Sequence, residues 1–154
     1  MWRQLVDTPF DRTLMFLRVV LGIVFLAHGM QKMLGWFGGP GFNGAMNMFT
    51  VAMHIPAPLA FLAIATEFFG SIALLIGFLA RLAGLAIAIE MAVAVLLVHV
   101  PNGFFMNWTG NQPGEGFEYH ILATAIALTI MLNGAGAWSL DHVLARTIRR
   151  GVVA

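Results

Sequence analysis

The chain has 154 residues, of which 60% are hydrophobic and only 10% are Asp, Glu, Lys or Arg. An average soluble domain contains roughly one quarter charged residues, so this composition favours lipid as the surrounding medium. The net charge of +1 argues against nucleic acid as a partner. The absence of cysteine excludes disulfide scaffolds, thiolate metal sites and thiol exchange on this chain.

Four apolar runs are candidates for transmembrane helices. A helix needs about 20 residues to cross about 30 Å of hydrocarbon, so a chain of this length has room for about four spans. Short stretches rich in Gly, Pro or polar residues separate the runs. The sequence therefore predicts an all-α membrane protein, a single membrane domain over residues 1–154 that forms a four-helix bundle, with spans at about 14–31, 58–79, 82–100 and 117–132.

Two further segments are predicted to be helical without crossing the bilayer. Apolar residues recur at helical spacing from Phe42 to Met53, so this segment is predicted to lie at the membrane interface or to re-enter between the first two spans. A short amphipathic helix is predicted over Ser139–Arg150. Its polar side carries Arg146, Arg149 and Arg150.

The cations outside the predicted spans are unevenly distributed. One side of the bundle is predicted to carry Lys32, and the other side Arg3, Arg12, Arg81, Arg146, Arg149 and Arg150. Cytoplasmic loops of membrane proteins carry an excess of Lys and Arg. We therefore expect both termini to face the cytoplasm.

Charged residues also occur inside the apolar runs, where a charge without a partner is costly. Glu67 and Glu90 lie in the second and third runs, and Arg18 lies in the first. On an ideal helix, Arg18, His28 and Lys32 share one face, which we expect to point into the bundle. Arg18 and Glu90 lie at similar depths and are predicted to form an ion pair, which can serve simply to fix helix register.

Polar residues near the outer ends of the spans are expected to line one pocket. The candidates are Glu67, His28, Lys32, His99, Glu118 and His120. His99 points about 180° away from Glu90 on an ideal helix, so the two can share a pocket only if the helix unwinds near Pro101. Glu118 equally suits the first turn of a helix, where the helix dipole favours an acid.

Two chemical roles fit such a pocket. A carboxylic acid inside a bundle can cycle its proton near neutral pH, so Glu67 and Glu90 are candidates for a proton relay. The candidate ligand-binding residues are Arg18, His28, Lys32, His99, Glu118 and His120. His28, Glu67 and His120 have the chemistry of transition-metal ligands. No HxxxH, HExxH or ExxH spacing supports a metal, so none is predicted.

Several short motifs follow one another in a fixed order. They are Arg18, Gly22, His28-Gly29 and Lys32, then Glu67-x-x-Gly70 and Leu75-x-Gly77, then Arg81 and Glu90-Met91-x-x-Ala94, and finally Glu118 and Gly134-x-Gly136-x-x-Ser139-Leu140-Asp141. Together they resemble the DoxX family of small bacterial inner-membrane proteins over about residues 12–142. The resemblance implies a four-helix bundle in the bacterial inner membrane.

For some DoxX relatives the resemblance also implies redox chemistry. Those relatives are a membrane subunit of thiosulfate:quinone oxidoreductase, or membrane partners of soluble sulfurtransferases and superoxide-detoxifying enzymes. We therefore expect a subunit of a quinone-linked redox system in sulfur oxidation or oxidative-stress defence, with quinone as cofactor and a soluble oxidoreductase or sulfurtransferase as partner.

Two alternatives remain open at the sequence level. One is a non-enzymatic membrane module that binds or transports a small lipid or metabolite, or that scaffolds soluble enzymes. Four spans are few for a transporter, so this alternative favours a homo-oligomer. The other is that the internal charges merely fix helix packing and the protein acts in assembly.

Overall fold

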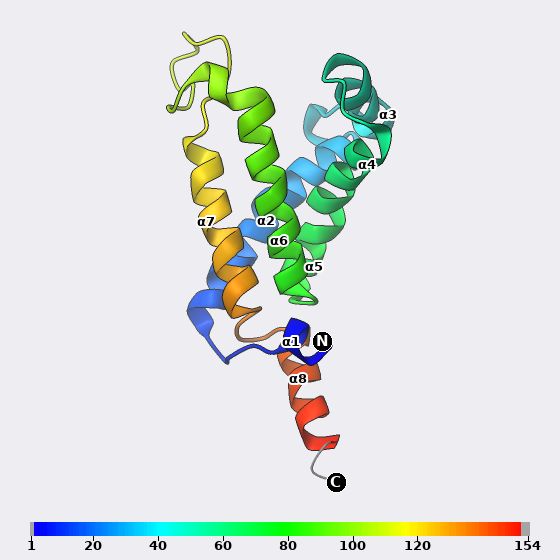
Figure 1. Cartoon of the computed structure of the whole chain (residues 1–154), viewed down its shortest axis with the longest axis vertical. Coiled ribbons are helices and arrows are strands. Elements are labelled where there is room, and N and C mark those ends of the chain that lie inside the picture. The colour runs from blue at the N-terminus through cyan, green and yellow to red at the C-terminus, as the bar shows by residue number, and fades with distance from the viewer. Residues whose placement is uncertain (1, 152–154) are drawn as a thin grey trace.

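The computed structural model describes the backbone of residues 2–151 and the side chains of residues 3–148, and within that range it is helical, with no strand. The long helices alternate in direction (Figure 1). We call the end that carries α1 and α8 the terminal end, and the end that carries residues 103–117 the loop end. The prediction of an all-α protein is confirmed for the described residues.

The elements are, in chain order, α1 (Trp2–Val6), α2 (Arg12–Leu34), the 3-10 turn η1 (Trp36–Gly38), α3 (Gly41–Asn47), the π-helical η2 (Met48–Ala52), α4 (Ala57–Ala65), the π-helical η3 (Thr66–Gly70), α5 (Ser71–Ile76), α6 (Ala80–Ala94), the π-helical η4 (Val95–His99), the 3-10 turn η5 (Val100–Asn102), α7 (Glu118–Asn133) and α8 (Leu140–Gly151).

Among the described residues, three continuous helical segments are long and apolar enough to cross a membrane: Arg12–Leu34, Ala57–Ile76 and Ala80–Asn102. The fourth apolar helix, α7, has 16 residues. At about 1.5 Å per residue it covers about 24 Å, less than the hydrocarbon thickness. It runs antiparallel to α6 and packs along it (Figure 1). Three candidate spans are therefore present, and the fourth stays a prediction.

The segment between the first two spans is helical, as α3 and η2. Ala45 is completely buried, and the ring of Phe42 lies edge-to-face with that of Phe61 on α4, with centroids 6.3 Å apart. The segment thus packs on α4 at the loop end of the molecule (Figure 1). Its interfacial or re-entrant position stays a prediction.

The predicted spans place a turn at residues 80–81. In the structure the turn between α5 and α6 comes earlier, at residues 77–79. Gly77 ends α5 in the left-handed region at φ 68°, and Leu79 adopts φ 49°. The Asp141 carboxylate then accepts hydrogen bonds from the backbone N–H groups of Leu79 (2.8 Å) and Ala80 (3.0 Å). An acid that caps a helix N-terminus in this way fixes where the helix begins. Arg81 consequently belongs to the first turn of α6.

Glycine permits two close helix contacts in the bundle. A Cβ atom on Gly84 of α6 would lie 2.7 Å from the carbonyl oxygen of Ala127 on α7, and one on Gly29 of α2 would lie 2.7 Å from the Phe68 Cα atom in η3. Both distances are shorter than real Cβ contacts, so the backbones can approach this closely because these residues have no side chain. Around these contacts lie buried apolar residues that include Leu21, Phe25, Leu74, Ile87 and Ile130.

The last helix, α8, extends from the terminal end along the long axis of the molecule (Figure 1). A helix predicted over 139–150 is confirmed. Ala145 is buried and Arg146 is exposed, as an amphipathic helix requires. The predicted polar positions of Arg149 and Arg150 fall outside the side chains that the structure describes.

Candidate functional site

A cluster of ionisable side chains lies inside the bundle between α2, η3, α6 and α7. Its centre is an ion pair between Lys32 of α2 and Glu67 of η3, with Nζ 2.6 Å from Oε2. The side chains are 19% and 9% exposed. In an apolar environment each charge needs the other, because separating them would leave a charge without compensation.

Two local features bring Lys32 and Glu67 together. Gly29 lies one helical turn before Lys32, and its missing side chain lets α2 approach the backbone of Phe68, the residue after Glu67. Glu67 itself lies in the π-helical turn Thr66–Gly70. A π turn widens a helix by one residue per turn and is frequent at functional sites.

Glu90 and Tyr119 extend the cluster. Glu90 on α6 interacts electrostatically with Glu67 and Lys32, and Tyr119 on α7 interacts electrostatically with Glu67. Glu90 Oε2 and the Tyr119 hydroxyl are buried without a hydrogen-bond partner among the described residues. Buried polar atoms without a partner are rare and call for an explanation such as a bound molecule. Tyr119 is absent from the predicted pocket residues, although its place beside His120 was a signal for it.

The irregular end of the third span brings His99 to His120. The helix is π-helical over Val95–His99 and continues as a 3-10 turn. One extra residue in a turn rotates the following side chains by about 100°. The two imidazole rings lie with centroids 3.9 Å apart. The sequence indicated that His99 could turn in this direction only if the helix unwinds near Pro101, and the helix is irregular there. His120 is 7% exposed, and its Nδ1 is buried with no partner in the described part of the chain.

Arg18 does not pair with Glu90, so that prediction is wrong. Arg18 is 1% exposed, and its guanidinium donates to backbone carbonyl oxygens instead. The acceptors are Ala135 (2.8 Å), Leu75 (2.7 Å), Trp138 (3.3 Å), Ala137 (3.4 Å) and Leu74. Five carbonyls match the five N–H groups of an arginine, so no donor remains for a ligand. Arg18 therefore joins the end of α5 to the segment before α8, where helix ends leave carbonyls unpaired.

The Gly134–Asp141 motif belongs to the same structural junction. The Gly136 N–H donates to Thr8 Oγ1 at 2.7 Å, and the Ser139 hydroxyl donates to the Gly136 carbonyl at 2.8 Å. Burial raises the pKa of Asp141, whereas its two amide donors and the charges of Arg18 and Arg81 act in the opposite direction. The motif thus closes the terminal end of the bundle rather than forming part of the polar cluster.

Two predicted pocket residues lie away from the cluster. His28 is exposed on α2, so the prediction that it points into the bundle with Arg18 and Lys32 is wrong: it lies about 80° around the helix from Arg18, at the edge of the inward face. Glu118 lies in the first turn of α7, and its Oε1 accepts from the Met106 N–H at 3.1 Å and from Trp108 Nε1 at 3.4 Å. Glu118 therefore orders the loop before α7. Within the described residues, no group of three or more His, Asp or Glu side chains is arranged to hold a metal ion.

An apolar groove of about 450 Å³ runs between the third span and α7, with His120 in its lining. Its lining includes Val95 and Leu96 of η4 and Ile121, Thr124 and Leu128 of α7, with His120 at the end nearest the loop end of the molecule. Leu96 is 72% exposed. The groove therefore opens on the apolar surface of the bundle.

Comparison with known families decides the identity of the bundle. The sequence profile described as DoxX matches residues 13–100. The chain belongs to the DoxX family. The match includes Lys32, Glu67, Glu90 and His99, while Tyr119 and His120 follow it in the chain. A DoxX chain with three helices apolar enough to span a bilayer is a membrane protein.

Several relatives match along most of their length. An uncharacterized protein of Haemophilus influenzae is 32% identical over 133 residues, which cover 84% of this chain and 88% of the relative. The protein named "Putative oxidoreductase CatD" of Bacillus subtilis is 27% identical over 147 residues, 96% of this chain and 98% of the relative. The protein named "Inner membrane protein YqjF" of Escherichia coli is 27% identical over 127 residues, 82% of this chain and 88% of the relative. No solved structure matches the chain at a significant level.

Proposed function

We propose that this DoxX chain is the membrane subunit of a quinone-linked redox system and that its buried cluster binds the quinone headgroup and supplies protons to it. The observation that carries the proposal is a set of three buried polar atoms without a partner among the described residues: Glu90 Oε2, the Tyr119 hydroxyl and His120 Nδ1. Glu90 and Tyr119 interact electrostatically with Glu67, and His120 follows Tyr119 on α7 and lines the apolar groove.

The groove suits a molecule with a polar head and an apolar tail. Its volume of about 450 Å³ lies in the range of ordinary ligand sites, roughly 300 to 1,000 Å³. The groove opens on the apolar surface, so a ligand can enter from lipid, and the His120 ring in its lining supplies a hydrogen-bond donor for a carbonyl oxygen. Tyr119 does not line the groove, and we assign its hydroxyl to the part of the headgroup that reaches the buried cluster. A bound quinone would supply the acceptor that takes up two electrons and two protons.

The residues of the chain hold and move the protons. The Lys32 ammonium contacts the Glu67 carboxyl group directly, with 2.6 Å between Nζ and Oε2. Glu90 retains a carboxyl oxygen with no partner in the described part of the chain, and this oxygen is free to accept and release a proton. Glu90 and Tyr119 each interact electrostatically with Glu67, and we propose that protons pass among these groups to a headgroup held at His120.

The electrons come from a partner in this proposal. The chain has no cysteine for dithiol chemistry. A soluble enzyme that oxidises a reduced sulfur anion such as thiosulfate would release two electrons as two thiosulfate ions join to form tetrathionate. The name of the similar Bacillus subtilis protein, which contains the word oxidoreductase, supports a redox role.

We also propose that the terminal end faces the cytoplasm. Arg3, Arg12, Arg81 and Arg146 lie in elements or turns at that end, and the positive-inside rule places such residues in the cytoplasm. The cluster and the groove would then lie toward the periplasmic half of the membrane.

Small-molecule extraction and mass spectrometry of protein purified in mild detergent test the proposal. The expected result is a co-purified quinone that is retained by His28→Ala and lost from His120→Ala, because His28 is exposed away from the cluster. A co-purified metabolite in place of quinone in both proteins would contradict the redox role and favour a binding module.

A further inference from the structure

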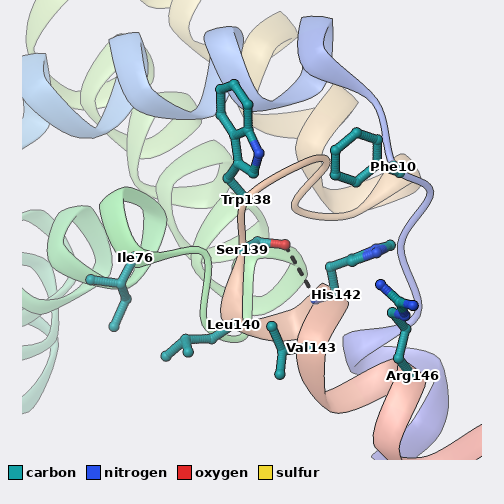
Figure 2. A pocket seen from close by; sticks show the side chains of 8 residues that line it. All are labelled: Phe10, Ile76, Trp138, Ser139, Leu140, His142, Val143 and Arg146. Atoms are coloured by element: carbon teal, nitrogen blue, oxygen red, sulfur yellow. Dashed lines mark hydrogen bonds between the residues drawn. The ribbon is translucent and has the colours of Figure 1, made fainter.

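We propose that a second groove, at the terminal end, binds an anionic phospholipid of the adjacent leaflet. The groove encloses about 430 Å³ between α8, the segment before it, the end of α5 and the connection from α1 to α2. Its lining includes Phe10, Ile76, Trp138, His142, Val143 and Arg146 (Figure 2). It lies at the opposite end of the bundle from the proposed quinone site and does not depend on that function.

One side of the groove is apolar and exposed. Ile76, Leu140 and Val143 are 47%, 47% and 59% exposed and point to the same side in Figure 2. Ile76 is the last residue of the second candidate span, so this surface continues the apolar surface of the membrane helices. An acyl chain is the partner that such a surface meets at the end of a span.

The other side of the groove is cationic. Arg146 and His142 lie next to each other there, with the Phe10 ring 5.4 Å from the imidazole (Figure 2). Arg146 is exposed and forms no ion pair among the described residues. His142 Nδ1 is buried without a hydrogen-bond partner in the same range. A phosphate group at the mouth of the groove would bind the exposed Arg146, since arginine binds phosphate through charge-assisted hydrogen bonds.

The charge of this end selects an anionic ligand. All seven arginines of the chain occur in the segments of the terminal end or in α8, against three aspartates, whereas the four glutamates lie elsewhere. Arg12 adds a cation 6.0 Å from the centre of the Trp138 ring, and Trp138 is 68% exposed, as tryptophans at the membrane interface are. One phospholipid matches the groove as a whole. Its phosphate fits the cationic side, its acyl chain fits the apolar side, and its glycerol backbone lies between them.

Native mass spectrometry of the full chain in mixed micelles tests this site, with phosphatidylglycerol and phosphatidylcholine as the probes. We expect the protein to retain phosphatidylglycerol in preference to phosphatidylcholine. Arg146→Gln should weaken retention of phosphatidylglycerol about fivefold, the effect of one arginine near an anionic surface. Arg146→Lys should preserve most of it. Arg3→Gln is the matched control, because it removes the same charge from an exposed residue of α1 outside the groove.

Three results would overturn the proposal. They are equal retention of the two lipids, equal losses in Arg146→Gln and Arg3→Gln, and displacement of phosphatidylglycerol by millimolar inorganic phosphate. The second result would mean a general charge effect, and the third would mean that the acyl chain adds nothing. Val143→Asn provides an independent measurement, since it should weaken retention while keeping every charge.

Discussion

The Lys32 ammonium lies 2.6 Å from Glu67 Oε2, and this contact ties the first span to the π-helical turn of the second. It converts two charges that lipid would reject into one neutral unit. Glu90 interacts electrostatically with both residues of this pair and Tyr119 with Glu67, and each has a buried atom without a hydrogen-bond partner among the described residues. A polar centre of this kind can hold a ligand headgroup and remain stable when the ligand is absent.

Lys32→Met should destabilise the protein, because it leaves Glu67 without its partner. We expect a loss on the order of 3 kcal/mol in the free energy of unfolding. The double variant Lys32→Met/Glu67→Met should regain most of that loss, since neither charge then remains. Denaturant unfolding in detergent, arranged as a double-mutant cycle, measures the coupling. Additive losses in the cycle would refute the ion pair.

Arg18→Met should also lower the free energy of unfolding. The expected loss is about 1–3 kcal/mol for each buried carbonyl that is left without a donor, if the surrounding structure does not rearrange. Glu90→Gln should not change this loss, because Arg18 bonds to carbonyls and not to Glu90. Thermal unfolding of the two single variants and the double variant separates these cases. If Glu90→Gln cancels the loss caused by Arg18→Met, the result would support the Arg18–Glu90 ion pair that the sequence predicted.

Gly29→Ala should push α2 away from η3, because the new Cβ would meet the Phe68 backbone at 2.7 Å. Overpacking of this kind costs about 1–3 kcal/mol. Gly70→Ala is the control. Gly70 lies in η3, the π-helical turn that Gly29 contacts, and a Cβ atom on Gly70 would have Thr66 Cγ2 as its nearest neighbour at 3.7 Å. We expect a lower melting temperature for Gly29→Ala and little change for Gly70→Ala. Equal melting temperatures would show that the close approach of α2 is not required.

The absence of cysteine makes the membrane orientation directly testable. Thr109→Cys lies on the loop at the loop end and Thr147→Cys lies on α8, and both positions are exposed. A membrane-impermeant maleimide should label Thr109→Cys in intact spheroplasts. It should label Thr147→Cys only after the membrane has been permeabilised. The reverse pattern would contradict a cytoplasmic terminal end.

Composition and hydropathy predicted the helical fold well, because a span must satisfy its own backbone hydrogen bonds and so leaves a long apolar signal. The Arg18 contacts were not predictable in the same way. Charge suggested a charged partner, whereas the structure supplies five carbonyls from α5 and the segment after α7. Such acceptors carry no sequence signal, since every residue has a carbonyl group.

The candidate site was predicted in part, for reasons of helix geometry. Lys32 and Glu67 were assigned to one pocket and are in contact, whereas His28 was assigned to it and is exposed. The ideal helix of 3.6 residues per turn placed Lys32 of α2 correctly, but it also placed the exposed His28 on the inward face, and it could not place His99. The π turn that rotates His99 toward His120 is a property of the folded chain.

Titration of the purified protein with a soluble short-tailed quinone analogue tests the central claim most directly. The account predicts saturable binding by the wild type and by the control His28→Ala, with at least about tenfold weaker binding by His120→Ala and by Tyr119→Phe, because each loses a hydrogen bond worth roughly 1.4 kcal/mol to a buried headgroup. Absence of binding by the wild type, or binding that all four proteins share equally, would contradict it.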